Sequence, residues 1–304
     1  MTPASGHQTV LVRGAQQAVM VEVGGGLRTY TVGGEAVLDG YDEEDLCAGA
    51  RGQPLLPWPN RLADGRYEWE GRQLQVPLSE PETATAIHGL TRWSNWIVAE
   101  ASTASARLYH HLHPQPGYPW SLEVSHLYAL GPEGLEVTTT VVNRSRQPAP
   151  FGLGFHPYLA AFGGLVDDVE LTVPAATSFA SDDRGLPTGR QPVAGAEDDF
   201  RAGRPVGDRR LNLAVTDLSR GPDGRAVVEL RHPRSGRSVR LWVDEAYGFV
   251  MLFTGDTLDD IGRRRHGLAV EPMTGPPNLL RTGDGRQVLS PAQPFVARWG
   301  IQTS

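Results

Sequence analysis

Helical periodicity is nearly absent from the hydrophobic pattern of this 304-residue chain. Apolar residues instead alternate with polar ones or form short β-branched runs, and the turns between them draw on 36 glycines and 24 prolines. A period of two places every second side chain on the same face of a strand, whereas a helix needs apolar residues three and four positions apart. The pattern therefore predicts an all-β protein made of many short strands.

Individual segments show where these strands turn back. Residues 65–76, GRYEWEGRQLQV, predict a hairpin that turns at Glu70 and Gly71. Residues 226–244 predict a second hairpin, which turns at a Ser-Gly pair. Residues 135–145, LEVTTTVVNRS, predict a strand whose odd-numbered side chains share one face.

Three segments are expected to lie outside the strands. Residues 42–52, DEEDLCAGARG, predict one short helical turn, residues 181–210 a long loop inside the domain, and residues 262–267, GRRRHG, an exposed solvated turn. No repeat of the length of a propeller blade is visible, and no change of composition suggests a linker. We therefore expect residues 1–304 to form a single domain, a large sandwich of antiparallel β-sheets.

Charge and composition exclude several classes of function. The formal net charge is −7 and the basic residues are scattered, so we expect no nucleic-acid partner. All 28 basic residues are arginine, which excludes a Schiff-base or P-loop lysine. Cys47 is the single cysteine, so neither an internal disulfide nor a cysteine-based zinc site can form. Without a signal-peptide pattern or a membrane-spanning apolar run, we expect a cytoplasmic protein with no membrane partner.

Two histidine-containing segments are ambiguous when each is considered alone. His156 lies in LGFHPYLA, residues 153–160, and its apolar neighbours favour a packed core histidine. His111 and His113 share one strand face at a spacing that suits a metal. No third ligand is evident beside them, so we expect no metal and favour a solvated or sugar-facing strand.

Four polar stretches carry the remaining candidates. They are LPWPNRLADGRYEWEG with Asn60 and Arg61, AIHGLTRWSNW with His88, GLGFHPYL with His156, and LAVEPMTGPPNLL with Glu271. A residue before proline is held in extended geometry, so Glu271 is expected to end a strand with its side chain fixed in direction. Taken singly, each stretch has a structural explanation: an ion pair for Arg61, a turn cap for His88, or a salt bridge for Glu271.

In this order and with these neighbours, the four stretches resemble the aldose 1-epimerase (galactose mutarotase) family. The resemblance runs from VGGGLRTY through GYPWSLEVSHLYAL and NRSRQPAPFGLGFHPYL to the closing FVARWGI, which is nearly the whole chain. It implies the family's fold, a large antiparallel β-sandwich. It also implies a cofactor-free reaction in which Glu271 is the base at the anomeric hydroxyl of an aldohexose and His156 is the acid at the ring oxygen.

The resemblance further implies the residues that contact the sugar. Asn60, Arg61, His88 and Tyr158 match positions within or beside the family's sugar-contacting motifs. The family commonly has an aspartate between the histidine and the glutamate, and our alignment places Asn212 there. Either Asn212 or one of the nearby residues Asp208 and Asp217 would then contact the sugar hydroxyls. We expect a monomer or a homodimer.

Three alternative functions remain open from the sequence. A non-catalytic sugar-binding protein would use the same fold. A hexose 6-phosphate 1-epimerase would need several arginines at the pocket mouth, for which Arg61, Arg66 and Arg92 are candidates. A glycoside hydrolase is disfavoured because its usual chemistry needs two facing carboxylates, and Glu271 alone is well placed.

Overall fold

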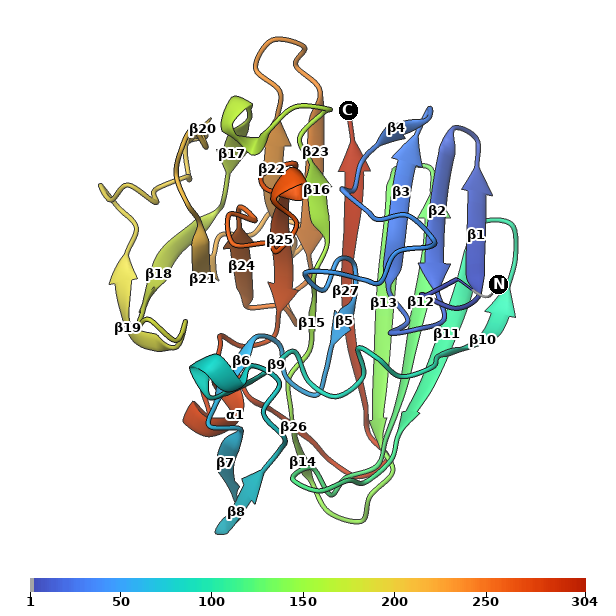
Figure 1. Ribbon diagram of the computed structural model, residues 1–304, viewed down its shortest axis with the longest axis vertical. Helices are drawn as coiled ribbons and strands as arrows, with labels where there is room; N and C mark the ends of the chain where they lie inside the picture. Colours follow the sequence, from blue (N-terminus) through green and yellow to red (C-terminus); the bar gives the residue numbers. More distant parts are fainter. Residues whose placement is uncertain (1–2) are drawn as a thin grey trace.

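Two large antiparallel β-sheets enclose the main hydrophobic core in the computed structural model, which describes residues 3–304 (Figure 1). The nine-stranded sheet contains, in spatial order, β10 (Ile97–Ala101), β11 (Ser105–Leu112), β12 (Leu122–Gly131), β13 (Gly134–Asn143), β27 (Pro294–Thr303), β23 (Ser238–Val243), β22 (Ala226–Arg231), β17 (Glu170–Thr172) and β20 (Arg204–Pro205). The eight-stranded sheet contains β19 (Pro187–Pro192), β18 (Ala175–Ser181), β21 (Asn212–Leu218), β24 (Phe249–Phe253), β25 (Gly267–Met273), β15 (Gly154–Phe155) and β5 (Pro54–Leu55), and β16 (Tyr158–Ala160) also pairs with β25. The predicted fold class, an antiparallel β-sandwich, is confirmed.

Smaller elements cover the two sheets. A four-stranded sheet of β1 (Gln8–Arg13), β2 (Gln16–Val21), β3 (Leu27–Val32) and β4 (Glu35–Ala36) lies beside β10–β13 (Figure 1). Three two-stranded sheets pair β6 (Arg61–Ala63) with β9 (Thr85–Ile87), β7 (Arg66–Trp69) with β8 (Arg72–Gln75), and β14 (Ala149–Phe151) with β26 (Gln287–Leu289). The helices are α1 (Leu279–Thr282) and the 3-10 turns η1 (Pro81–Thr83), η2 (Val166–Asp168) and η3 (Ile261–Arg263). Within residues 3–304, no helix is long and apolar enough to cross a membrane.

The strand patterns read from the sequence are confirmed. Glu70 and Gly71 connect β7 to β8 with φ angles of 49° and 74°, the left-handed geometry that a two-residue hairpin turn needs. Residues 226–244 form the β22–β23 hairpin. Along β13, the odd-numbered side chains from Leu135 to Asn143 are buried and the even-numbered ones are half-buried.

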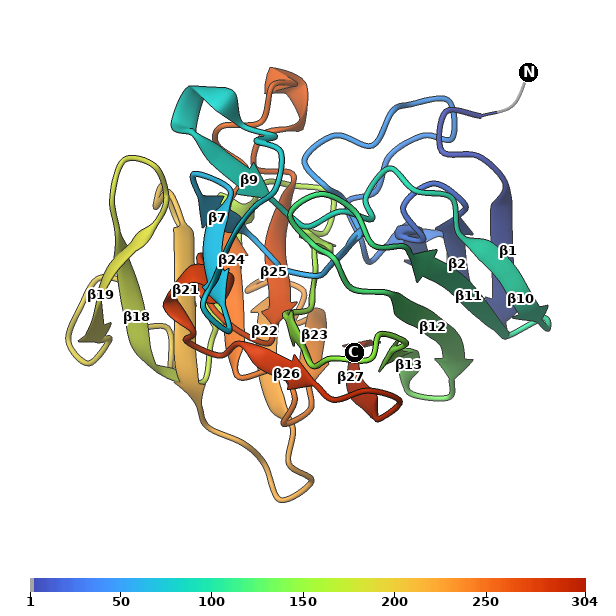
Figure 2. The same cartoon turned by 90° about the horizontal axis from the view of Figure 1, so that it is seen from below.

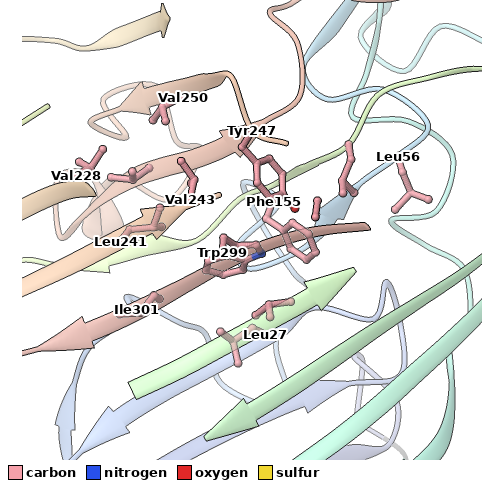
Figure 3. Packing of buried hydrophobic residues seen from close by; sticks show 14 of the residues in the cluster. Leu27, Leu56, Phe155, Val228, Leu241, Val243, Tyr247, Val250, Trp299 and Ile301 are labelled. Atoms are coloured by element: carbon pink, nitrogen blue, oxygen red, sulfur yellow. The ribbon is translucent and has the colours of Figure 1, made fainter. Parts of the chain in front are cut away.

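Aromatic side chains fill the core between the two sheets. The rings of Phe155 and Trp299 lie 5.1 Å apart between their centroids, and both side chains are fully buried (Figure 3). Val250 on β24 and Leu241 on β23 approach from the two sheets beside them (Figure 3).

Strand alternation gives the eight-stranded sheet a second buried face. Leu268 and Val270 of β25 belong to the main core, whereas Ala269 and Met273 belong to two smaller apolar clusters. Glu271 has the same parity as the second pair, so the alternation of the strand directs it away from the main core. The smaller sheets β6–β9 and β7–β8 and helix α1 lie near the C-terminal end of β25 (Figures 1 and 2).

Two predictions about non-strand segments are wrong. Residues 42–52 form no helix, because Gly49, Ala50 and Gly52 have φ angles of 61°, 57° and 68°, which a right-handed helix cannot contain. Residues 181–210 include β19 and β20 as well as the end of β18. The side chains of β19 are largely exposed, so the strand shows no apolar alternation and is held by its backbone pairing with β18.

The prediction of an exposed, solvated turn at residues 262–267 is only partly confirmed: Gly262 and His266 are exposed, but the Arg265 side chain is not solvated. The guanidinium of Arg265 lies 2.7 Å from a carboxylate oxygen of Asp167 and 2.8 Å from one of Asp256. Its side chain is only 14% exposed. The arginine therefore ties this loop to two neighbouring segments.

Candidate active site

A cavity of about 380 Å³ opens on the second buried face of the eight-stranded sheet. The residues predicted as the acid, the base and the main sugar contacts all line it: Asn60, Arg61, His88, His156, Tyr158, Asn212 and Glu271. They come from five separate segments of the chain. The fold therefore brings together residues that lie up to 211 positions apart in the sequence, from Asn60 to Glu271.

His156 and Glu271 form the centre of this cavity. Glu271 lies on β25 opposite Met251 of β24, and His156 lies in the connection between β15 and β16. His156 Nε2 is 3.3 Å from Glu271 Oε1, and the side chains are 6% and 2% exposed. The structure thus places a proton donor and a proton acceptor in direct contact, although both come from apolar sequence contexts.

Burial favours the uncharged form of each member of this pair. It lowers the pKa of His156 to about 3, and the nearby Arg92 and Arg51 guanidinium groups act in the same direction. It raises the pKa of Glu271 well above its ordinary value, although Arg61 opposes this shift. These two shifts favour a pair that carries one transferable proton, on the carboxyl group. The second oxygen of that group, Oε2, has no hydrogen-bond partner within residues 3–304.

His88 and Asn60 form a hydrogen-bonded unit at the wall of the cavity. Their φ angles are 64° and 54°, and the His88 N–H donates to the Asn60 carbonyl at 3.0 Å. The Asn60 backbone N–H donates to His88 Nδ1 at 3.2 Å, so in the neutral ring the proton lies on Nε2. Burial, followed by Arg92 and His156, lowers the pKa of His88 well below its usual value. His88 is thus a neutral donor with its Nε2–H group.

Arg61 is held in one orientation by Glu80. Its Nε and Nη2 atoms donate to the two Glu80 carboxylate oxygens at 2.7 and 3.0 Å, and Thr85 Oγ1 donates to Glu80 Oε2 at 2.8 Å. This paired geometry fixes the guanidinium plane. Nη1 makes no hydrogen bond within the part of the chain that the structure describes and lies beside Gly185.

Tyr158 lies deep in the cavity, whereas Asn212 lies at its mouth. The Tyr158 hydroxyl donates to the Gly49 carbonyl at 3.0 Å, and the ring is buried against His156. Asn212, at the start of β21, is exposed at the cavity mouth. Asp208 and Asp217 are not among the lining residues, so of the three alternatives left open by the sequence only Asn212 reaches the cavity.

Sequence reasoning missed other parts of the lining. The loop after β24 contributes residues 257–260, and Glu80 and Arg51 also contribute. The sequence indicates Arg92 only as a candidate phosphate ligand. No motif marks these residues, and only their position in the fold reveals them.

The spacing of His111 and His113 does not create a metal site in this structure. Their rings stack at 4.2 Å, and His111 Nε2 is hydrogen-bonded to Ser121 Oγ at 2.6 Å. Among residues 3–304 there is no group of three or more His, Cys, Asp or Glu side chains that could hold a metal ion.

Comparison with known proteins gives one consistent family. A family model described as aldose 1-epimerase matches residues 8–301. The uncharacterized protein YihR of Escherichia coli (strain K12) is 31% identical over 294 residues, which cover 95% of this chain and 91% of that protein.

Two solved structures show the same fold. A galactose mutarotase-like protein from Clostridium acetobutylicum superposes with a TM-score of 0.87 at 18% identity, covering 100% of this chain and 97% of that one. A galactose 1-epimerase from Lactobacillus acidophilus NCFM superposes with a TM-score of 0.81 at 20% identity, covering 98% of this chain and 94% of that one.

Proposed function

The chain belongs to the aldose 1-epimerase family, and from this premise we propose that it interconverts the α and β anomers of a free aldose. The observation that carries the proposal is the buried contact of 3.3 Å between Glu271 Oε1 and His156 Nε2 inside a cavity lined by hydrogen-bonding groups. Ring opening removes a proton from one sugar oxygen and adds one to another, so the reaction needs an acid and a base together.

The proton count of the pair suits this reaction. Transfer of its one proton from Glu271 to His156 gives a carboxylate and an imidazolium. The carboxylate accepts the proton of the anomeric hydroxyl while the imidazolium protonates the ring oxygen, and the bond between the anomeric carbon and that oxygen breaks. The open-chain aldehyde then faces a protonated Glu271 and a neutral His156, which is the state that burial favours. After the aldehyde rotates, the reverse transfers close the other anomer.

The remaining cavity residues would orient the sugar. The His88 Nε2–H and Arg61 Nη1 donors suit hydroxyl or ring oxygens, and the Tyr158 ring supports His156 from within the protein. Fixed donors of this kind hold a substrate in a reactive geometry and replace water around it.

The arrangement of the arginines favours a free aldose over a hexose 6-phosphate. Arg66 is not among the lining residues and donates instead to Gln75 on the β7–β8 hairpin. The charge of Arg61 is matched by Glu80. Arg51 also lines the cavity, but it is paired with Asp39. This leaves Arg92, whereas a phosphate dianion is best held by several converging guanidinium groups.

The activity is expected to be maintained as the pH falls through the ordinary pKa of histidine, 6.5. When the pH falls through the lowered pKa of His156, about 3, both groups become protonated and no base remains. When the pH rises through the raised pKa of Glu271, the pair loses its proton and no acid remains. The profile of kcat/KM reports these free-enzyme transitions as properties of the pair. A loss of activity as the pH falls through 6.5, the ordinary pKa of histidine, would contradict this assignment.

Asn212→Asp is expected to change KM or the preference among aldoses, with little effect on kcat. Asn212 is exposed at the cavity mouth and carries no charge, so a carboxylate there alters hydroxyl contacts outside the reacting centre. Steady-state kinetics with glucose and galactose would check this. If kcat fell by orders of magnitude at unchanged KM, Asn212 would have a role in the chemical step that this account does not give it.

Polarimetry of freshly dissolved α-anomers tests the proposed function. We expect acceleration with free glucose or galactose, weaker acceleration with their 6-phosphates, and no loss of rate in the presence of a chelator. Tight sugar binding without any acceleration would instead identify a non-catalytic sugar-binding protein.

A further inference from the structure

The imidazole of His156 lacks the hydrogen bond that usually orients a proton-transferring histidine. Its Nε2 atom faces Glu271, but its Nδ1 atom is buried without a hydrogen-bond partner on any other residue in the described part of the chain. In most such histidines the second ring nitrogen donates to a carbonyl or carboxylate, which fixes both the tautomer and the ring plane. Other contacts must therefore fix the plane of this ring.

Aromatic contacts replace the missing hydrogen bond. The Tyr158 ring stacks on His156 with centroids 4.9 Å apart and an angle of 12° between the planes. The His88 ring meets His156 edge to face at 5.2 Å. Stacking fixes a ring plane only if the partner ring is itself fixed, so the support of Tyr158 determines how well His156 is held.

Arg51 is part of that support. Its guanidinium carbon lies 4.6 Å from the centroid of the Tyr158 ring, the geometry of a cation–π contact. The side chain is 5% exposed and is held in turn by Asp39 Oδ2, 3.3 Å from Nη2, and by the Ala48 carbonyl, 3.3 Å from Nη1. The arginine is therefore itself fixed in the folded protein.

The backbone around Arg51 holds the His156 backbone as well. The Gly52 N–H donates to the His156 carbonyl at 2.8 Å, and the His156 N–H donates to the Gln53 carbonyl at 3.1 Å. Gly52 has a φ of 68°, and a Cβ atom added there would lie 1.8 Å from the Leu27 carbonyl oxygen, so only glycine fits. Residues 49–53 thus contact His156 through its backbone and, by way of Tyr158, through its ring.

We propose that Arg51 is a positioning residue of the reaction. Through the Tyr158 ring, it holds the His156 imidazole in the orientation that directs Nε2 at Glu271. This inference rests on the proposed function and deepens it, because it names what aligns the acid. The arginine also lowers the pKa of His156, after the larger contributions of burial and Arg92. Loss of its charge should therefore raise that pKa.

Kinetics of Arg51→Met and a matched control test the positioning role. Misplacing a catalytic group by a fraction of an ångström to an ångström can cost about 10- to 100-fold in rate. We expect a loss of this size in kcat, an unchanged KM and an acid limb at higher pH. Arg51→Lys, which keeps the charge, should recover part of the rate. The control is Arg263→Met, because Arg263 also pairs with Asp39 but is not among the residues that line the cavity. Arg263→Met should show the same kcat, KM and acid limb as the unmodified protein.

A raised KM at unchanged kcat would make Arg51 a direct sugar contact and would overturn the proposal. So would an equal loss in Arg263→Met, which would indicate a general effect on the Asp39 ion pairs.

A readout independent of turnover separates this proposal from the proposed function. In NMR spectra of the histidine ring resonances of the sugar-free protein, Arg51→Met should raise the pKa of His156 and broaden its signals through ring motion. If the unmodified protein shows no anomer conversion but His156 responds in this way, the positioning contact stands and the proposed function fails. An unchanged His156 titration and line width in Arg51→Met would reject the positioning contact, whatever the activity.

Discussion

Glu271→Gln is expected to lower kcat for anomer conversion by about 10²–10⁴-fold, the usual contribution of a positioned acid or base. The substitution keeps the shape of the side chain and its hydrogen-bonding capacity but removes the group that accepts the anomeric proton. Because the carboxyl group is buried in a preformed cavity, the sugar should still bind. Rates at saturating sugar, with binding measured separately by calorimetry, would check both parts.

His156→Asn should have an effect of similar size, because an amide cannot deliver a proton near neutral pH. The two groups exchange protons as one unit, so the double variant should be little worse than the poorer single variant. Glu229→Gln is a matched control, since Glu229 pairs with Arg240 on the other sheet and is not among the cavity-lining residues. Near-normal turnover in either single variant would remove that residue from the mechanism.

Phe155→Ala is expected to lower the free energy of unfolding by about 3–5 kcal/mol, as large-to-small changes in a close-packed core do. The ring is fully buried and packs against Trp299 with centroids 5.1 Å apart (Figure 3). It also packs against His126 at 5.1 Å, so truncation leaves a cavity that its neighbours cannot fill. Urea unfolding would measure the change, provided that the dependence of the unfolding free energy on urea concentration is the same in both proteins. Val227→Ala is the control, because Val227 is 38% exposed and should shift stability by no more than about 0.5 kcal/mol. A loss below about 1 kcal/mol in Phe155→Ala would show that the core relaxes around this site.

The strands could be predicted where one face is buried and the other is not. Strand β13 shows this alternation over its full length, and the turn at Glu70 and Gly71 needs residues that accept positive φ. Strand β19 could not be predicted, because its exposed side chains carry no pattern and only the backbone pairing with β18 defines it. The helical turn expected at residues 42–52 failed because two glycines and an alanine there adopt left-handed geometry.

The candidate site was predictable only as a set of residues. Four stretches in a specific order identified the family, and the cavity contains the acid, the base and the sugar-contact residues predicted from them. The contact between His156 and Glu271 depends on the pairing of β15 and β16 with β25, which no local pattern encodes. The same holds for Arg51 and Glu80, whose sequence contexts resemble ordinary surface turns.

We propose that the buried pair of Glu271 and His156 converts anomers of a free aldose. NMR exchange spectroscopy at anomeric equilibrium tests it most directly, because the α and β signals of one sugar are observed as they interconvert. We expect rapid exchange with the unmodified protein, and exchange slower by about 10²–10⁴-fold with Glu271→Gln at a concentration where the sugar is bound. Equal exchange rates with the two proteins would contradict it.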